Sequence, residues 1–233
     1  MGAQQKNPLN NMFSGFLIEH FKIFMKIRNI IFDLGGVLLD INYTRTERAF
    51  IDLGCKDFHA IYSQARQTAL FDDFERGKIT ETAFFEELKV LSGLKHISHQ
   101  KLKTAWNAML IGFPEESYKL LKNLKTKYRI FLLSNNNETH VKFYEKMIEK
   151  VCPVKEFENL FENFHYSYRM GLKKPDAACF LHVLTENNLN AAETIFIDDT
   201  IQHVEGAAKT GIKAYWLEQP MTTENLLKEL QLI

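Results

Sequence analysis

The sequence predicts an α/β protein with a doubly wound parallel sheet, and three observations support this fold class. Short runs of apolar residues recur along the chain, amphipathic segments lie between them, and one long stretch contains helical patterns alone. Runs that are apolar throughout are typical of strands buried on both faces. Their alternation with helices favours right-handed crossovers within one sheet, which binds ligands at the carboxyl ends of its strands.

The expected strands are short apolar runs followed by polar residues. In chain order they are 29–34, 129–133, 194–197 and 213–216, and segment 163–168 is a candidate for a further strand. Strands that alternate with helices pair in parallel, because each crossover returns the chain to the same edge of the sheet. We therefore expect these runs to share one parallel sheet.

Two segments between the strands predict amphipathic helices. The first, 114–128, begins at a proline and places Leu120, Leu121 and Leu124 on one stripe, and the second, 175–187, also begins at a proline. Proline is favoured in the first turn of a helix, where its missing N–H has no partner to lose. An apolar stripe on each helix would pack against the sheet.

Residues 42–111 interrupt the alternation, because they contain helical patterns only. Phe84, Leu88 and Leu91 recur at helical spacing, and a second set follows the same rule: Leu102, Trp106 and Met109. We expect a helical cap here, inserted after the first strand and lying over its carboxyl end as lids do. A packed helical cluster without a functional role would show the same periodicity. The predicted organisation is an amino-terminal appendage, 1–24, a core made of 25–41 and 112–233, and the cap, 42–111.

The composition favours chemistry on small molecules. The 233 residues carry 29 basic and 29 acidic side chains, so no net field attracts nucleic acid or an anionic membrane. Cys55, Cys152 and Cys179 lack the paired spacing of a disulfide framework or a thiolate metal site, which suits a reducing, cytoplasmic setting. Near the amino terminus, Glu19 and Lys22 interrupt the apolar run, so we expect neither a signal peptide nor a membrane span there.

Polar residues of particular kinds follow the predicted strands. They are Asp33 with Gly35 and Gly36, Ser134 with Asn135, Lys174, and the pair Asp198 and Asp199. Three carboxylates drawn together at these ends would repel one another, and one lysine cannot balance them, whereas a divalent cation can. Mg²⁺ prefers carboxylate oxygens, waters and a substrate phosphate as ligands. This set of residues therefore suits phosphoryl transfer.

Each feature alone also has a plain structural explanation. An aspartate ahead of two glycines is a common turn former, and a pair of aspartates is common at the amino end of a helix. Lys174 precedes a helix whose N–H groups favour an anion, but it could equally be a solvated charge, as could Lys173 beside it. Only the order of the features together favours catalysis.

Four segments resemble the ordered motifs of the haloacid dehalogenase (HAD) superfamily of aspartate-nucleophile hydrolases. They read FDLGGVLLD, LLSNNN, GLKKPDAACF and FIDDTIQHVEGAAKTG. Residues 42–111 resemble the helical cap that this family inserts between its first two motifs. The resemblance implies a Rossmann-like core. Among subgroups the chain looks most like subfamily IA sugar-phosphate phosphatases related to the amino-terminal domain of soluble epoxide hydrolase.

The resemblance implies a catalytic role for several side chains. Asp33 resembles the nucleophile, which forms an aspartyl phosphate that water later hydrolyses. Lys174 resembles the lysine that neutralises the nucleophile and the phosphate. Ser134 and Asn135 resemble the pair that hydrogen-bonds the phosphoryl oxygens. Gly36 is expected to place a backbone N–H near the phosphate and to leave room for it, and a plain turn role would explain this glycine equally well.

The resemblance also implies a magnesium site. Asp33 and Asp199 resemble its carboxylate ligands, Gly35 stands where the family donates a backbone carbonyl, and Asp198 would act through a water. Together with Lys174, the ion would stabilise charge on the transferring phosphoryl group.

Gly35 departs from the family pattern, because many of these phosphatases carry a second aspartate there as the general acid and base. Such help is typically worth about 100-fold to 10,000-fold, so cleavage of simple alkyl phosphates should be slow. A sugar 1-phosphate would escape this limit, since its anomeric hydroxyl is a more acidic leaving group. Asn136 and His203 also depart from the commoner residues at their positions.

We expect a Mg²⁺-dependent phosphatase of small phosphorylated metabolites that has no nucleic-acid or membrane partner and is a monomer or homodimer. One alternative is a metal-independent 2-haloacid dehalogenase, which the pair Asp198 and Asp199 opposes, since without a cation it makes ionised Asp33 costlier. Another is a catalytically weak regulator that binds a phosphorylated ligand, which the missing acid at Gly35 would explain.

Overall fold

The computed structural model describes residues 26–63, 66–67 and 69–233. The predicted appendage, 1–24, lies outside these described residues. At the centre is a sheet of parallel strands in the order β7-β6-β1-β8-β9. The strands are β1 (Asn29–Phe32), β6 (Arg129–Ser134), β7 (Asn163–Tyr166), β8 (Thr194–Asp198) and β9 (Lys213–Trp216). The predicted parallel α/β fold class is confirmed, and the candidate strand at 163–168 is present as β7.

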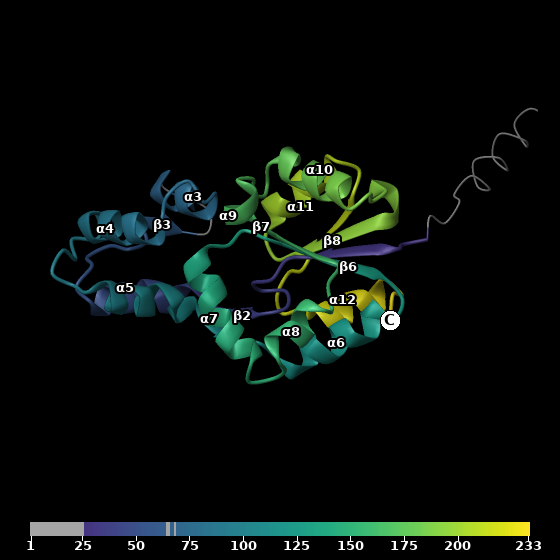
Figure 1. Cartoon of the computed structure of the whole chain (residues 1–233), viewed down its shortest axis with the longest axis horizontal. Helices are drawn as coiled ribbons and strands as arrows, with labels where there is room; N and C mark the ends of the chain where they lie inside the picture. Colours follow the sequence, from purple (N-terminus) through teal and green to yellow (C-terminus); the bar gives the residue numbers. More distant parts are fainter. Residues whose placement is uncertain (1–25, 64–65, 68) are drawn as a thin grey trace, which may run out of the picture.

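Helices cover both faces of this sheet (Figure 1). On one side lie α6 (Glu115–Lys125), α7 (Glu138–Ile148), α8 (Val154–Glu158) and α12 (Thr223–Glu229). On the other lie α9 (Ser167–Met170), α10 (Ala177–Glu186) and α11 (Ile201–Ala208), and a 3₁₀ turn, η2 (Ala191–Glu193), precedes β8. Alternate residues of β1 point to opposite faces of the sheet. Ile30 and Phe32 belong to the core cluster on the side of α6 and α12, and Ile31 belongs to the cluster on the side of α10.

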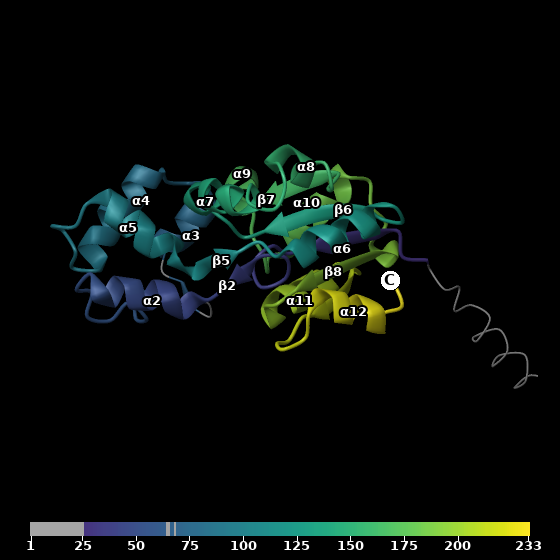
Figure 2. The same ribbon diagram turned by 90° about the horizontal axis from the view of Figure 1, so that it is seen from below.

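The segment after β1 forms a separate lobe at one end of the molecule in both views (Figures 1 and 2). It contains α2 (Tyr43–Asp52), α3 (Ala69–Glu75), α4 (Glu81–Leu91), α5 (His99–Trp106) and the 3₁₀ turn η1 (Asn107–Met109). The side chains of Asn42, Thr80 and Ser98 accept hydrogen bonds from the first turns of α2, α4 and α5, so polar residues fix where these helices begin.

The sequence pattern predicted a purely helical lobe, and this prediction is wrong. A short antiparallel pair, β2 (Asp40–Ile41) with β5 (Leu110–Gly112), joins it to the sheet domain, and a second pair, β3 (Tyr62–Ser63) with β4 (Arg66–Gln67), lies within it. The expected apolar stripe on α4 is wrong at Leu91, which is 46% exposed, because the buried face of this helix is completed by Phe85 beside Phe84 and Leu88.

No helix within the described ranges is both long enough and apolar enough to span a lipid bilayer.

Candidate active site

The strand register brings the predicted residues to one edge of the sheet. Phe32 in β1 is level with Leu132 in β6 and Ile197 in β8, so the residues that follow on each strand emerge side by side. A cavity opens at this edge, between the sheet and the lobe of α2 to α5. Its lining includes these predicted residues: Asp33, Gly35, Ser134, Asn135, Lys174 and Asp199.

Lys174 is the centre of a buried charge cluster. Its Nζ lies 2.7 Å from Oδ1 of Asp33 and 2.6 Å from Oδ2 of Asp198, and the side chain is 1% exposed. Burial alone would lower the pKa of Lys174, but the charges of Asp198 and Asp33 outweigh it and raise this pKa. The ammonium group therefore stays charged between two carboxylates, where it can neutralise both.

The residues alone did not decide which of the two lysines points inward, but the family resemblance favoured Lys174, and the structure separates the two. Nζ of Lys173 lies 2.6 Å from Oε2 of Glu75 and 3.2 Å from Oδ1 of Asp72, both in α3. Lys173 thus pairs with the lobe, and Lys174 with the carboxylates at the sheet edge.

The three aspartates differ in their electrostatic environment. Burial raises the pKa of Asp33, the charge of Asp198 adds to the rise, and Lys174 opposes it. Burial also acts on Asp198, but Lys174 and His203 outweigh it and lower this pKa to about 2. Burial, together with the charges of Asp33 and Asp198, raises the pKa of Asp199 to about 7. One lysine is therefore too little positive charge for the cluster.

The aspartates could hold a divalent cation, because one carboxylate oxygen from each lies within 4.8 Å of the others. Asp198 is fully buried, and its oxygens accept hydrogen bonds from the Thr200 N–H at 2.8 Å and from Lys174. Asp33 and Asp199, by contrast, line the cavity. This donor set fits Mg²⁺ in chemistry and charge, with Asp33 and Asp199 as the accessible ligands.

Gly36 has a steric role that differs from the one expected. Its φ is +73°, and a Cβ there would lie 2.3 Å from Oδ2 of Asp199, so only glycine lets the loop pass this carboxylate. Its N–H donates to the Leu39 carbonyl oxygen at 2.8 Å inside the turn. The Gly36 N–H, which we expected near the phosphate, is therefore used within the turn.

Gly35 lies beside an apolar side chain. A Cβ at Gly35 would come within 3.1 Å of Cδ1 of Ile41, which also lines the cavity. A side chain at this position would therefore press against Ile41, which would have to shift slightly.

Asn135 holds the backbone of Lys174 in place. Its Oδ1 accepts from the Lys174 N–H, and its Nδ2 donates to the Lys174 carbonyl oxygen, both at 2.9 Å. The side chain thus positions the lysine rather than standing free toward the cavity. Ser134, which is 4% exposed, lines the cavity at the end of β6.

Several cavity residues were not found from the sequence. Glu75 and Tyr62 come from the lobe, and His140 comes from α7. His140 stacks on the Trp106 ring at 4.9 Å between centroids, and burial lowers its pKa to about 4, so the ring is neutral at pH 7. Nothing in the local pattern marks these residues, because only the packing of the lobe on the sheet domain brings them to the cavity.

Comparisons with known proteins agree on one family. The model for haloacid dehalogenase-like hydrolases matches residues 27–211. The D-ribitol-5-phosphate phosphatase of Bacteroides thetaiotaomicron is 27% identical over 89% of this chain and 98% of that protein. A sesquiterpene phosphatase of Aspergillus oryzae is 28% identical over 86% of this chain and 94% of its own length. A HAD family enzyme of B. thetaiotaomicron, solved as an aspartate-to-alanine variant with magnesium and inorganic phosphate, superposes with a TM-score of 0.80 at 28% identity, covering 86% of this chain and 98% of that one.

Proposed function

The chain belongs to the haloacid dehalogenase-like hydrolase family, and on this premise we propose that it hydrolyses small phosphorylated metabolites through an aspartyl-phosphate intermediate. The chain is a phosphatase, and its cofactor is Mg²⁺. The main support for the aspartyl-phosphate mechanism is the contact of Lys174, which lines the cavity, with both Asp33 and Asp198.

We assign Asp33 as the nucleophile. Its carboxylate oxygen forms a bond to phosphorus while the bond from phosphorus to the leaving alcohol oxygen breaks, and water then hydrolyses the aspartyl phosphate. Lys174 favours the ionised form of Asp33 and offsets charge on the phosphoryl oxygens, which Ser134 at the end of β6 would contact. Asp33, Asp199, the Gly35 carbonyl and, through a water, Asp198 would hold Mg²⁺. When bound, the ion adds positive charge against the phosphate.

Removal of the metal should abolish turnover. We expect EDTA to stop phosphate release from every substrate that the enzyme accepts and excess Mg²⁺ to restore it, because without the cation the carboxylates repel a phosphate dianion. The measurement is release of inorganic phosphate from a panel containing a sugar 1-phosphate, ribitol 5-phosphate and a terpenyl monophosphate. Turnover that persists in EDTA would contradict the proposal, and halide release from 2-chloropropionate would instead favour a dehalogenase.

We further propose that residues 42–111 act as a cap that selects sugar or polyol phosphates. Glu75 supports this, because its carboxylate lines the cavity and is tied to Lys173, with both side chains 10% exposed. A carboxylate held at the cavity can accept hydrogen bonds from substrate hydroxyl groups, which a terpenyl chain lacks. A cytoplasmic location and a monomeric or homodimeric state stay predictions from the sequence.

A substitution at this position tests the preference for hydroxylated substrates. We expect Glu75→Gln to raise KM for a polyol or sugar phosphate by about 10-fold, because a hydrogen bond to a charged acceptor is replaced by a weaker one. With p-nitrophenyl phosphate, which has no hydroxyl groups, kcat/KM should change little. Glu86→Gln on the exposed side of α4 is the matched control. An equal loss on both substrates would show that Glu75 supports the fold and does not select the substrate.

A further inference from the structure

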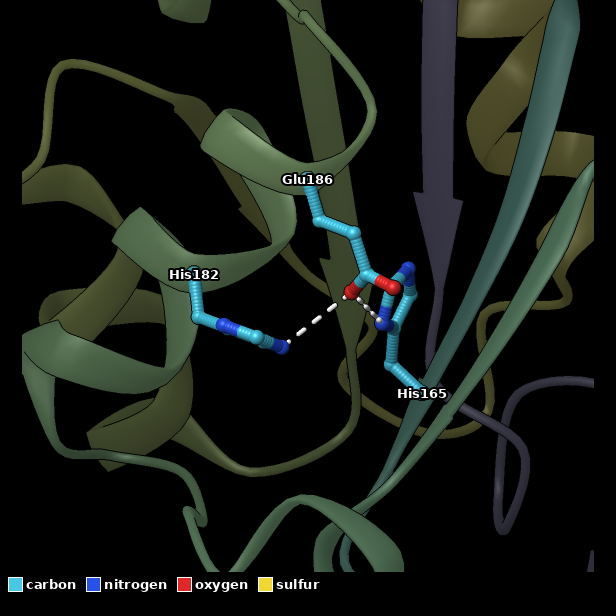
Figure 3. A group of neighbouring side chains, drawn as sticks. All are labelled: His165, His182 and Glu186. Atoms are coloured by element: carbon cyan, nitrogen blue, oxygen red, sulfur yellow. Dashed lines mark ion pairs between the residues drawn. The ribbon is translucent and has the colours of Figure 1, made fainter.

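A second cluster of side chains that can ligate a metal lies between β7 and α10 (Figure 3). His165 comes from β7, an edge strand of the sheet, and is 2% exposed. His182 and Glu186 are one turn apart on α10, and their side chains are 43% and 47% exposed. The three side chains point toward one another from two elements, β7 and α10.

The two distances from Glu186 to the imidazole nitrogens are close to those between ligands of a tetrahedral metal ion. Oε2 of Glu186 lies 3.4 Å from Nδ1 of His165 and 3.1 Å from Nε2 of His182, and one donor atom from each residue lies within 4.8 Å of the others. Zinc ligands at about 2.0–2.1 Å in a tetrahedron are separated by about 3.3–3.4 Å. We propose that His165, His182 and Glu186 bind a divalent transition-metal ion such as Zn²⁺.

The donor types separate this site from the catalytic one. Two imidazole nitrogens and one carboxylate suit zinc and related ions, whereas Mg²⁺ prefers the oxygen donors of the Asp33 cluster. His165 supplies a buried anchor, and the exposed His182 and Glu186 leave a path for entry and room for a water as the fourth ligand.

The plain alternative is an ion pair on α10 with a histidine nearby. In that state Asn187 donates from Nδ2 to Nε2 of His165 at 2.9 Å and to the Val183 carbonyl oxygen at 2.8 Å, so the ring carries its proton on Nδ1, toward Glu186. A metal ion takes the place of this proton. The ring proton then moves to Nε2, and the Asn187 amide turns to accept it. This turn breaks the bond from Asn187 Nδ2 to Val183 and the bond that Asn187 Oδ1 accepts from Asn163 Nδ2 at 3.3 Å. This cost makes the affinity lower than that of a site whose ligands are already in place.

Binding would tie β7 to the end of α10. This helix follows Lys174 in the chain, and β7 pairs with β6, which ends at Ser134. The ion bridges structural elements and touches no catalytic residue. Its expected effect is therefore on thermal stability, because a ligand that binds only the folded state stabilises it.

The test is a calorimetric titration of the full chain with Zn²⁺ in buffer that already contains saturating Mg²⁺, so that the aspartate site is occupied. We expect wild type to bind one Zn²⁺ at the imidazole site and to gain in melting temperature. His182→Ala and Glu186→Gln should weaken this binding at least about 10-fold and remove the gain. His96→Ala, an exposed histidine outside the cluster, is the matched control and should bind as wild type does.

Co²⁺ gives a second readout, since its visible absorption reports imidazole ligation and low coordination number. The bands should appear in wild type and be lost in His182→Ala, while both proteins keep the same Mg²⁺-dependent phosphatase activity. The proposal is overturned if wild type takes up no Zn²⁺ in the presence of Mg²⁺, or if His182→Ala and Glu186→Gln bind it as tightly as wild type.

Discussion

Replacing the Asp33 carboxylate with an amide, in Asp33→Asn, should reduce phosphate release by roughly 1,000-fold or more. The amide has nearly the same shape but is a poor nucleophile toward phosphorus, so no covalent intermediate forms. It also removes one of the charges that the cation and Lys174 share. The measurements are steady-state turnover and acid-quench trapping of a phosphoenzyme from a radiolabelled substrate.

The same variant should be at least as stable as wild type. Burial raises the pKa of Asp33, which means that ionised Asp33 is costly in the folded state, and Lys174 keeps Asp198 as its partner after the change. We therefore expect a free energy of unfolding equal to or above that of wild type. Asp52→Asn, an exposed aspartate on α2, is the control for turnover. A trapped phosphoenzyme in Asp33→Asn would rule out Asp33 as the nucleophile.

The strands were predictable because their signal is local. Ile30, Ile31 and Phe32 are all 0% exposed, and a run that is buried on both faces must be apolar at every position. The location of the candidate site could be predicted from the same strands, since the carboxyl ends of parallel strands meet at one edge of the sheet and polar residues follow those ends.

The packing of the lobe was less predictable because helical spacing fixes a stripe but not its width. Leu91 fits the expected stripe on α4 and yet is exposed, while Phe85, off that stripe, is buried among the aromatic rings of the lobe. In the same way, Glu75 and His140 reach the cavity through contacts between the lobe and the sheet domain, which no local pattern encodes. The Gly36 N–H was expected near the phosphate, but in the structure it donates to the Leu39 carbonyl oxygen. The sequence does not show this turn geometry.

Lys174→Met should combine loss of activity with a large loss of stability. Methionine keeps the length of the side chain but leaves Asp33 and Asp198 buried without their shared cation. Removal of one partner of a buried ion pair costs about 3–5 kcal/mol in the free energy of unfolding. Turnover should fall by roughly 100-fold or more even in excess Mg²⁺, because the phosphoryl oxygens also lose a positive charge. Urea unfolding at pH 7 and steady-state kinetics measure the two effects.

The loss of stability should depend on pH in a defined direction. In wild type the pKa of Asp198 is lowered from 3.8 to about 2, so its contribution is full above pH 3.8 and is lost as the pH falls toward 2. Without Lys174, burial raises the pKa of both carboxyls, so the folded variant takes up protons on acidification and its deficit shrinks. The unfolding curves of the two proteins should therefore converge at acidic pH. A deficit that stays constant with pH would mean that lost packing, and not uncompensated charge, causes the destabilisation.

Lys173→Met is the matched control, because it changes the neighbouring residue in the same way but removes the ion pairs with Glu75 and Asp72 in place of those with Asp33 and Asp198. This variant should also lose stability, since the buried Glu75 loses its ion pair with Lys173. It should nevertheless keep most of its turnover with p-nitrophenyl phosphate. If the two lysine variants lose turnover equally, the contact of Lys174 with Asp33 and Asp198 does not drive catalysis. If only Lys174→Met loses it, the charge at the sheet edge, and not the general effect of removing a buried cation, accounts for the chemistry.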